Sequence, residues 1–131
     1  MNISAYSRSN IMASFARWQV PKDFADPMYN YMVFGFEPGS CFTAVLANDW
    51  ARAIQSSHPN NTVEAFKALT GWIQDVLPQD AHGSYAAVKF WLAINDFERR
   101  EYLERLRLIH TEKEETWLNI KGDPVNEPQL W

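Results

Sequence analysis

The sequence predicts an all-α protein that folds as one compact domain of four to six helices. Apolar residues recur at three- and four-residue spacing in several segments, which is typical of helices with one buried face. Proline, glycine and polar capping residues separate these segments. The chain has 131 residues, of which 47% are hydrophobic and 15% aromatic. A chain of this length and composition can bury a core without disulfides or metals.

The first two predicted helices cover residues 11–18 and 28–34. Pro21 ends the first one, because proline cannot continue a helix. The pair Asp26-Pro27 is typical of a helix start, with Asp26 as the cap and Pro27 at the first helical position. Gly35 then ends the second helix. Residues 29–34 are also rich in β-formers, so a strand is the alternative there.

The next two predicted helices carry the clearest apolar faces. Ser40 is expected to cap a helix that continues to just before Pro59. Its inward stripe contains Phe42, Val45, Leu46, Ala53 and Ile54. Asn61, with Glu64 three residues later, is expected to cap the following helix, which ends at Pro78. Its apolar face contains Val63, Phe66, Leu69, Ile73, Val76 and Leu77.

The last helical part is expected to begin at Ser84, which would cap a helix with Trp91 on its inner face. The charged stretch 96–116 either continues this helix or follows a break near Asn95. Its narrow apolar stripe contains Leu103, Leu106 and Ile109. We therefore expect a helical domain over 1–120, with a charged extension from about 96, and a C-terminal tail over 121–131.

Composition limits the compartment and the partners. The net charge of −4 makes nucleic acid an unexpected partner. Cys41 is the single cysteine, which fits a reducing cytoplasm. No apolar run approaches the length needed to cross a membrane, and the N-terminus does not resemble a signal peptide. We expect a cytoplasmic protein without a membrane anchor.

No catalytic or metal-binding spacing is present, so we expect no enzyme activity, no cofactor and no metal. His58, His82 and His110 are scattered. Cys41 is either a nucleophile or a small core residue. The pair Asn48-Asp49 is the sharpest polar feature. We interpret it as a structural hydrogen-bonding pair, and a ligand-binding or acid–base carboxylate is the alternative.

The charged extension is the predicted contact surface. Its aromatic and arginine side chains are of the types enriched at binding hot spots, and the predicted binding residues are Phe97, Arg100, Tyr102 and Trp117. The arginines there, Arg99 included, either hold an anion or form a solvated, salt-bridged face, and the second interpretation is favoured. Deleting residues 97–131 is expected to leave a folded core that no longer binds.

About half of the chain resembles small, poorly characterised accessory proteins of tailed bacteriophages. Their leading motif is Pro-Gly, an aromatic residue, Ala-Val-Leu and Asn-Asp, and here it contains Gly35, Pro38, Gly39, Phe42, Ala44, Val45, Leu46, Asn48 and Asp49. Looser matches follow at Asn61, Trp72, Gly83, Ser84 and Trp91. The resemblance implies a phage origin and an accessory role in the cytoplasm of an infected bacterium. It implies no established activity and no catalytic residue.

These observations leave three functional hypotheses. The leading one is a non-enzymatic phage protein that binds and blocks or redirects a host protein, such as a defence protein. The first alternative is a sponge that sequesters a small signalling nucleotide, and the second is a small hydrolytic enzyme that uses Asp49, His58 or Cys41. A second copy of the chain is the rival to a host protein as the partner.

Overall fold

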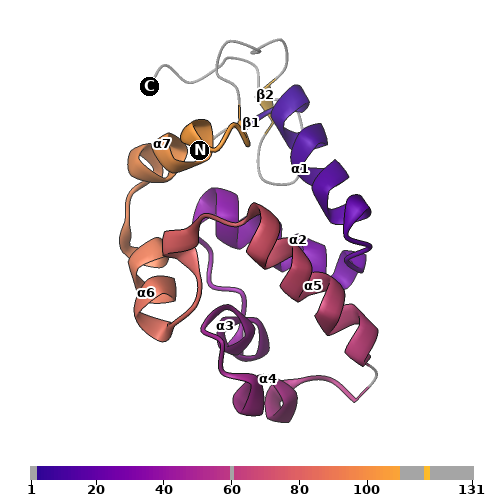
Figure 1. The fold of residues 1–131 in the computed structure, drawn as a ribbon. Coiled ribbons are helices and arrows are strands. Elements are labelled where there is room, and N and C mark those ends of the chain that lie inside the picture. The colour runs from indigo at the N-terminus through magenta and orange to yellow at the C-terminus, as the bar shows by residue number, and fades with distance from the viewer. Residues whose placement is uncertain (1–2, 60, 110–116, 119–131) are drawn as a thin grey trace.

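The computed structural model describes residues 3–59, 61–109 and 117–118, and the all-α class is confirmed for this part of the chain (Figure 1). Its α-helices number seven rather than the expected four to six: α1 (Ala5–Arg17), α2 (Lys22–Phe34), α3 (Ser40–Leu46), α4 (Trp50–Ser56), α5 (Val63–Val76), α6 (Tyr85–Ala93) and α7 (Asp96–Arg105). A short 3-10 helix, η1 (Gln79–Ala81), precedes α6. Two short strands, β1 (Ile3–Ser4) and β2 (Trp117–Leu118), pair antiparallel. The predicted tail over 121–131 lies outside the described residues.

The extra helix arises because the expected helix from Ser40 to Pro59 is two helices. Asn48 has a positive φ of 63°, in the left-handed region that asparagine tolerates better than most residues. The next residue, Asp49, accepts a hydrogen bond from the backbone N–H of Arg52 at 3.3 Å and so caps α4. The Asn-Asp pair therefore ends one helix and begins the next.

The first two helices begin earlier than the sequence predicts. Ser4 caps α1 by accepting a hydrogen bond from the Ser7 N–H at 3.1 Å, so the helix starts well before residue 11. Pro27 lies inside α2 and not at its first position, so Asp26 is not the cap. Gly35 ends α2 with a φ of 67°, as expected. The strand alternative for residues 29–34 is wrong.

The remaining caps divide between confirmed and corrected predictions. Ser84 caps α6 as predicted, with its side chain accepting from the Ala87 N–H at 3.1 Å. Thr62 caps α5 in place of Asn61. Gly39 precedes α3 in the cap position, so Ser40 is the first residue of that helix. Asn95 caps α7 by accepting from the Glu98 N–H at 2.8 Å, and this fixes the break between α6 and α7.

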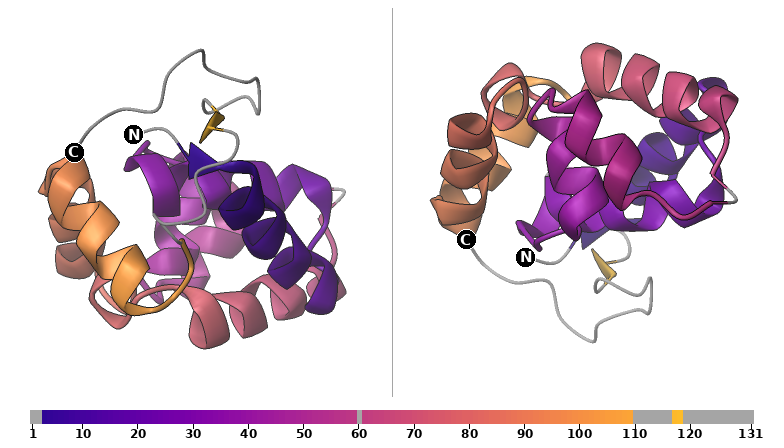
Figure 2. Two further views of the ribbon diagram at one scale, coloured as in Figure 1. Left: turned by 90° about the horizontal axis from the view of Figure 1, so that it is seen from above. Right: turned by 90° about the horizontal axis from the view of Figure 1, so that it is seen from below.

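Helix α2 runs through the middle of the molecule, as the two turned views in Figure 2 show. It is buried on most sides, which is typical of a central core helix. Tyr31 is fully buried on it, and its hydroxyl donates to the carbonyl of Ala81 at 2.7 Å. The Trp91 indole N–H donates to the Tyr31 carbonyl at 3.0 Å. One residue of α2 therefore holds both η1 and α6.

A second set of contacts within the core joins helices α1 and α5. Trp72 on α5 is fully buried, stacks on Phe15 with ring centroids 4.4 Å apart, and donates its indole N–H to Ser14 at 2.9 Å. Trp18 packs across α5 at Gly71, where a β-carbon would overlap the indole ring. The glycine thus permits a close approach that no larger residue would allow.

Helix α7 also belongs to the core. Leu103 is fully buried, and Arg99 is only 2% exposed. The Arg99 guanidinium donates to the carbonyls of Trp91 at 3.0 Å and Ile94 at 2.8 Å, so it closes the C-terminal end of α6. Residues beyond 96 therefore contribute side chains to the core, and the expected folding of a chain that lacks 97–131 stays a prediction. The interpretation of Arg99 as part of a solvated face is wrong, because Arg99 is buried.

Candidate functional site

The motif from Gly35 to Asp49 forms the chain from the end of α2 to the start of α4. Gly35 ends α2 beside the Arg99 guanidinium, which a β-carbon there would overlap. Pro38 lies in the loop that follows. Gly39 has a φ of 92°, a conformation that side chains rarely adopt, and it turns the chain into α3. The Asn-Asp pair comes at the end of this segment.

Asn48 and Asp49 make hydrogen bonds that join neighbouring elements. The Asn48 Oδ1 accepts from the Trp50 indole N–H at 3.1 Å. The Asp49 Oδ2 accepts from the Tyr85 hydroxyl at 2.6 Å, which joins the start of α4 to the start of α6. This bond from Tyr85, with the backbone N–H of Arg52, lowers the pKa of Asp49. Both carboxylate oxygens thus accept hydrogen bonds from other residues of the fold.

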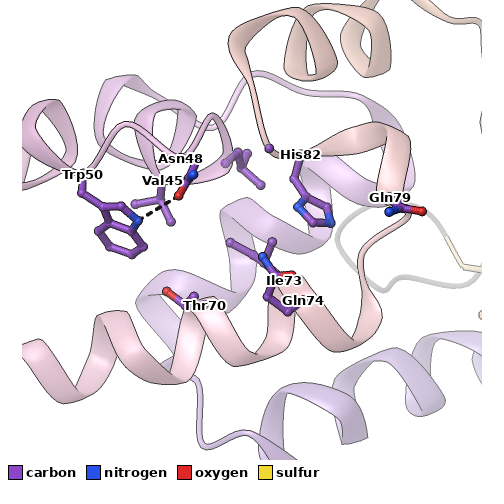
Figure 3. Close-up of a pocket in the computed structure, with 10 residues that line it drawn as sticks. Val45, Asn48, Trp50, Thr70, Ile73, Gln74, Gln79 and His82 are labelled. Carbon is purple, nitrogen blue, oxygen red and sulfur yellow. Dashed lines mark hydrogen bonds between the residues drawn. The ribbon is translucent and has the colours of Figure 1, made fainter.

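A cavity of about 290 Å³ opens between this turn and helix α5 (Figure 3). Asn48 and Trp50 form one wall, and His82 lies on the opposite side. Thr70, Ile73 and Gln74 of α5 face both of them, and the remaining lining residues are Val45, Leu46, Gln79 and Gly83. None of the ten lining residues carries a formal charge at neutral pH when the histidine is neutral.

Burial lowers the pKa of the His82 imidazole below its ordinary value, which favours the neutral form. A neutral imidazole offers one donor and one acceptor, and a carboxamide offers both as well. The cavity therefore combines His82 with the amides of Asn48 and Gln74 and the hydroxyl of Thr70. Such a set suits an uncharged ligand with amide-like donors and acceptors.

An apolar groove of about 410 Å³ continues from the cavity along α5, and both contain Trp50 and Thr70. Its other lining residues are Ile54, Val63, Phe66 and Lys67. The exposed fractions are 66% for Ile54 and 70% for Val63, so the prediction that both face the interior is wrong. We call the cavity and the groove together the α4–α5 surface.

The predicted contact residues of the extension have different environments. Phe97 is 58% exposed. Tyr102 packs edge-on against Trp91, with ring centroids 5.4 Å apart, and donates its hydroxyl to Asp80 at 3.0 Å. The Arg100 Nε lies 2.7 Å from the Glu104 carboxylate. Trp117 belongs to β2, where it pairs with Ser4. Phe97 is therefore exposed, whereas Arg100 and Tyr102 already have partners within the fold.

Two residues of the enzymatic alternative, Cys41 and Asp49, make hydrogen bonds within the fold. The Cys41 thiol donates to the carbonyl of Ala53 at 3.4 Å, and burial raises its pKa, so the nucleophilic thiolate is disfavoured. Asp49 is engaged by the hydrogen bonds from Tyr85 and Arg52. Among the described residues no three His, Cys, Asp or Glu side chains converge as a metal site. None of the helices in the described part is long and apolar enough to cross a membrane.

Sequence reasoning missed the α4–α5 surface because Ile54 and Val63 fit a helical apolar stripe, which normally faces the core. One signal was present: Trp50 and Ile54 are four residues apart directly after the Asn-Asp pair, so they share one face of a new helix. The buried position of α4 is Ala53, which lies between them in the sequence.

No family model, curated protein or solved structure matches this chain. The resemblance to phage accessory proteins therefore stays a prediction from the residues of the motif.

Proposed function

We propose that this protein is a non-enzymatic accessory protein of a tailed phage that binds a host protein through the α4–α5 surface. The observation that carries the proposal is the pair of exposed aliphatic side chains, Ile54 and Val63, in a groove that continues into an uncharged polar cavity. The phage origin and the host cytoplasm are supported by the resemblance of the motif.

The composition of the surface favours a segment of polypeptide as the bound element. The groove between α4 and α5 can take an apolar side chain against Trp50, Ile54 and Val63, which are 36%, 66% and 70% exposed. The adjoining amides and the neutral His82 can then pair with peptide N–H and C=O groups. Apolar anchors flanked by satisfied polar contacts are the usual anatomy of a binding hot spot.

Charge considerations support a neutral segment. Lys67 is the one charged residue among those that line the cavity and the groove. A strongly acidic or basic partner segment would lose its hydration there without an equivalent number of ion pairs. The partner is thus expected to present an apolar residue flanked by uncharged ones.

The test compares two matched exposed residues. The full-length protein and its Ile54→Glu and Phe97→Glu variants are used to capture proteins from host lysate, and the captured protein is then purified and its affinity measured directly. We expect Ile54→Glu to weaken this affinity at least about tenfold and Phe97→Glu to leave it unchanged. Phe97 is the control because it is similarly exposed and belongs to the sequence-predicted surface.

Four outcomes would overturn the proposal. A loss of affinity only with Phe97→Glu would place the contact on the extension. Unchanged affinity in both variants, or the absence of any specifically captured protein, would remove the α4–α5 surface as the site. Concentration-dependent dimerisation that Ile54→Glu abolishes would identify a second copy of this chain as the occupant.

A further inference from the structure

A second pocket lies between α1 and α2, and it differs from the α4–α5 surface in charge. Its volume is about 580 Å³, which is within the usual range for small-molecule sites. Its lining residues are Arg8, Met12, Lys22, Asp26, Tyr29, Asn30 and Phe36. Two cations and one carboxylate leave the lining with a net positive charge.

Tyr29 is the most informative residue of this pocket. It is only 5% exposed, and its hydroxyl is buried without a hydrogen bond to any described residue. A buried hydroxyl without a partner costs about 1–3 kcal/mol, so native structures rarely leave one unsatisfied. Burial raises its pKa to about 12, against the opposing effect of the Arg8 charge. The phenol therefore remains protonated and can donate a hydrogen bond.

Arg8 supplies a cation beside this phenol. It is half-buried, and among the described residues no carboxylate forms an ion pair with it. A guanidinium in such a position can bind a carboxylate or phosphate in a bidentate manner. Lys22 lies in the same lining as a second, exposed cation, and Asn30 adds an amide donor.

The pocket also has an apolar part. Phe36 is 52% exposed, and its ring centroid lies 5.9 Å from that of Phe34. Met12 lies in the same lining. An aromatic ring of a ligand would find a flat apolar contact there, next to the donors.

We infer that the pocket between α1 and α2 binds a small organic anion, with Arg8 and the Tyr29 hydroxyl holding its carboxylate or phosphate group and Phe36 contacting an aromatic ring. This activity goes beyond the binding of a host protein and is independent of the α4–α5 surface. A nucleoside monophosphate is one ligand of this class, and an aromatic carboxylate is another.

The test uses the full-length protein and four probes: inorganic phosphate, phenyl phosphate, benzoate and adenosine 5′-monophosphate. Binding is measured by calorimetry, with phenol as the uncharged control. We expect at least one aromatic anion to bind with a Kd below about 1 mM, and phenol to bind at least about tenfold more weakly. The comparison of phenyl phosphate with benzoate distinguishes the two kinds of anion, and the nucleotide shows whether a base is accepted.

Variants then locate the site. Tyr29→Phe and Arg8→Gln are each expected to weaken the bound anion about tenfold. Arg17→Gln is the matched control, because Arg17 is on the same helix, pairs with Asp75 at 3.1 Å and does not line the pocket. Tyr29→Phe should fold at least as well as the wild type, because it removes an unsatisfied hydroxyl.

The inference is overturned if none of the anions binds, if phenol binds equally well, or if Arg17→Gln weakens binding as much as Arg8→Gln does. Ile54→Glu is expected to leave anion binding unchanged. A failure of host-protein capture and a failure of anion binding are thus separate results.

Discussion

Helices α4 and α7 begin in the same way and end in opposite environments. Each follows a break in the chain and starts at a polar cap, Asp49 for α4 and Asn95 for α7. The apolar α4 buries only Ala53 and leaves Trp50 and Ile54 accessible. The highly charged α7 buries Leu103 and Arg99. From hydropathy alone, α4 would be expected to be buried and α7 to be exposed.

The difference shows that unsatisfied carbonyls can decide which helix is anchored. The last turn of α6 leaves the carbonyls of Trp91 and Ile94 without helical partners, and Arg99 supplies donors for both. The arginine also lies over the Trp91 ring, with its guanidinium carbon 5.8 Å from the ring centroid. No comparable set of unpaired carbonyls lies near Ile54 within the described fold, and its side chain stays exposed.

The largest expected effect is that of Arg99→Met. The change keeps much of the side-chain volume but leaves two carbonyls without donors, and we expect the free energy of unfolding to fall by about 3 kcal/mol. Urea denaturation followed by circular dichroism measures it. Arg105→Met, on the exposed side of α7, is the control and should cost less than about 1 kcal/mol. Equal effects of the two changes would show that Leu103, and not Arg99, anchors α7.

Gly35→Ala is expected to lower the free energy of unfolding by about 2 kcal/mol. The left-handed backbone costs about 1–2 kcal/mol with a β-carbon, and that carbon would also displace the Arg99 guanidinium. Gly39→Ala is a comparison without steric overlap, because no neighbouring atom lies within 4 Å of the position that its β-carbon would take, and its cost arises from its own backbone conformation, with φ 92° and ψ 169°. The double variant with Arg99→Met should be less destabilised than the sum of the single variants. Strict additivity would contradict the contact between Gly35 and Arg99.

Asp49→Ala is expected to lower the melting temperature by about 2–6 °C, because it removes both a helix cap and the bond from Tyr85. Tyr85→Phe removes only the second bond and should have a smaller effect. Hydrogen bonds hold the pKa of Asp49 below its ordinary value of 3.8, so its contribution is present above that pH and is lost as the pH falls further. The difference in melting temperature between wild type and Asp49→Ala should therefore disappear in acid. An unchanged melting temperature with lost binding would instead make Asp49 a ligand-binding carboxylate.

The smallest effect is expected for Ile54→Ala, which should change the free energy of unfolding by less than about 0.5 kcal/mol. The side chain is 66% exposed, and alanine favours the helix. Leu103→Ala, at a fully buried position of α7, should cost about 3 kcal/mol. A large loss with Ile54→Ala would show that α4 is part of the core and would weaken the case for a contact surface there.

The sequence was sufficient to predict the helical class and the positions of strong local signals. Ser84 and Gly35 mark a helix start and a helix end as predicted, because a serine cap and a left-handed glycine act within one turn. The choice of Asn61 over Thr62 missed the cap of α5 by one residue. Both residues can accept the same hydrogen bond, so the local pattern does not separate them.

The rest depends on contacts between distant parts of the chain. Arg99 is buried because of carbonyls on the preceding helix and a glycine at the end of α2, which no local pattern shows. The exposure of Ile54 and the pocket around Tyr29 likewise depend on how helices pack. The predicted binding residues Phe97, Arg100, Tyr102 and Trp117 remain to be tested, and Phe97→Glu begins that test.

The two buried indoles set conditions on how the chain reaches its native state. Trp72 bonds to Ser14 and Trp91 bonds to Tyr31, across 58 and 60 residues of sequence. Closing loops of this length costs conformational entropy before the core contacts can compensate for it. The helices therefore have to assemble cooperatively, and local helix formation alone does not bury either ring. Quenching and spectral shifts of these tryptophans should accordingly report the rate-limiting step of folding and not the earlier formation of helices.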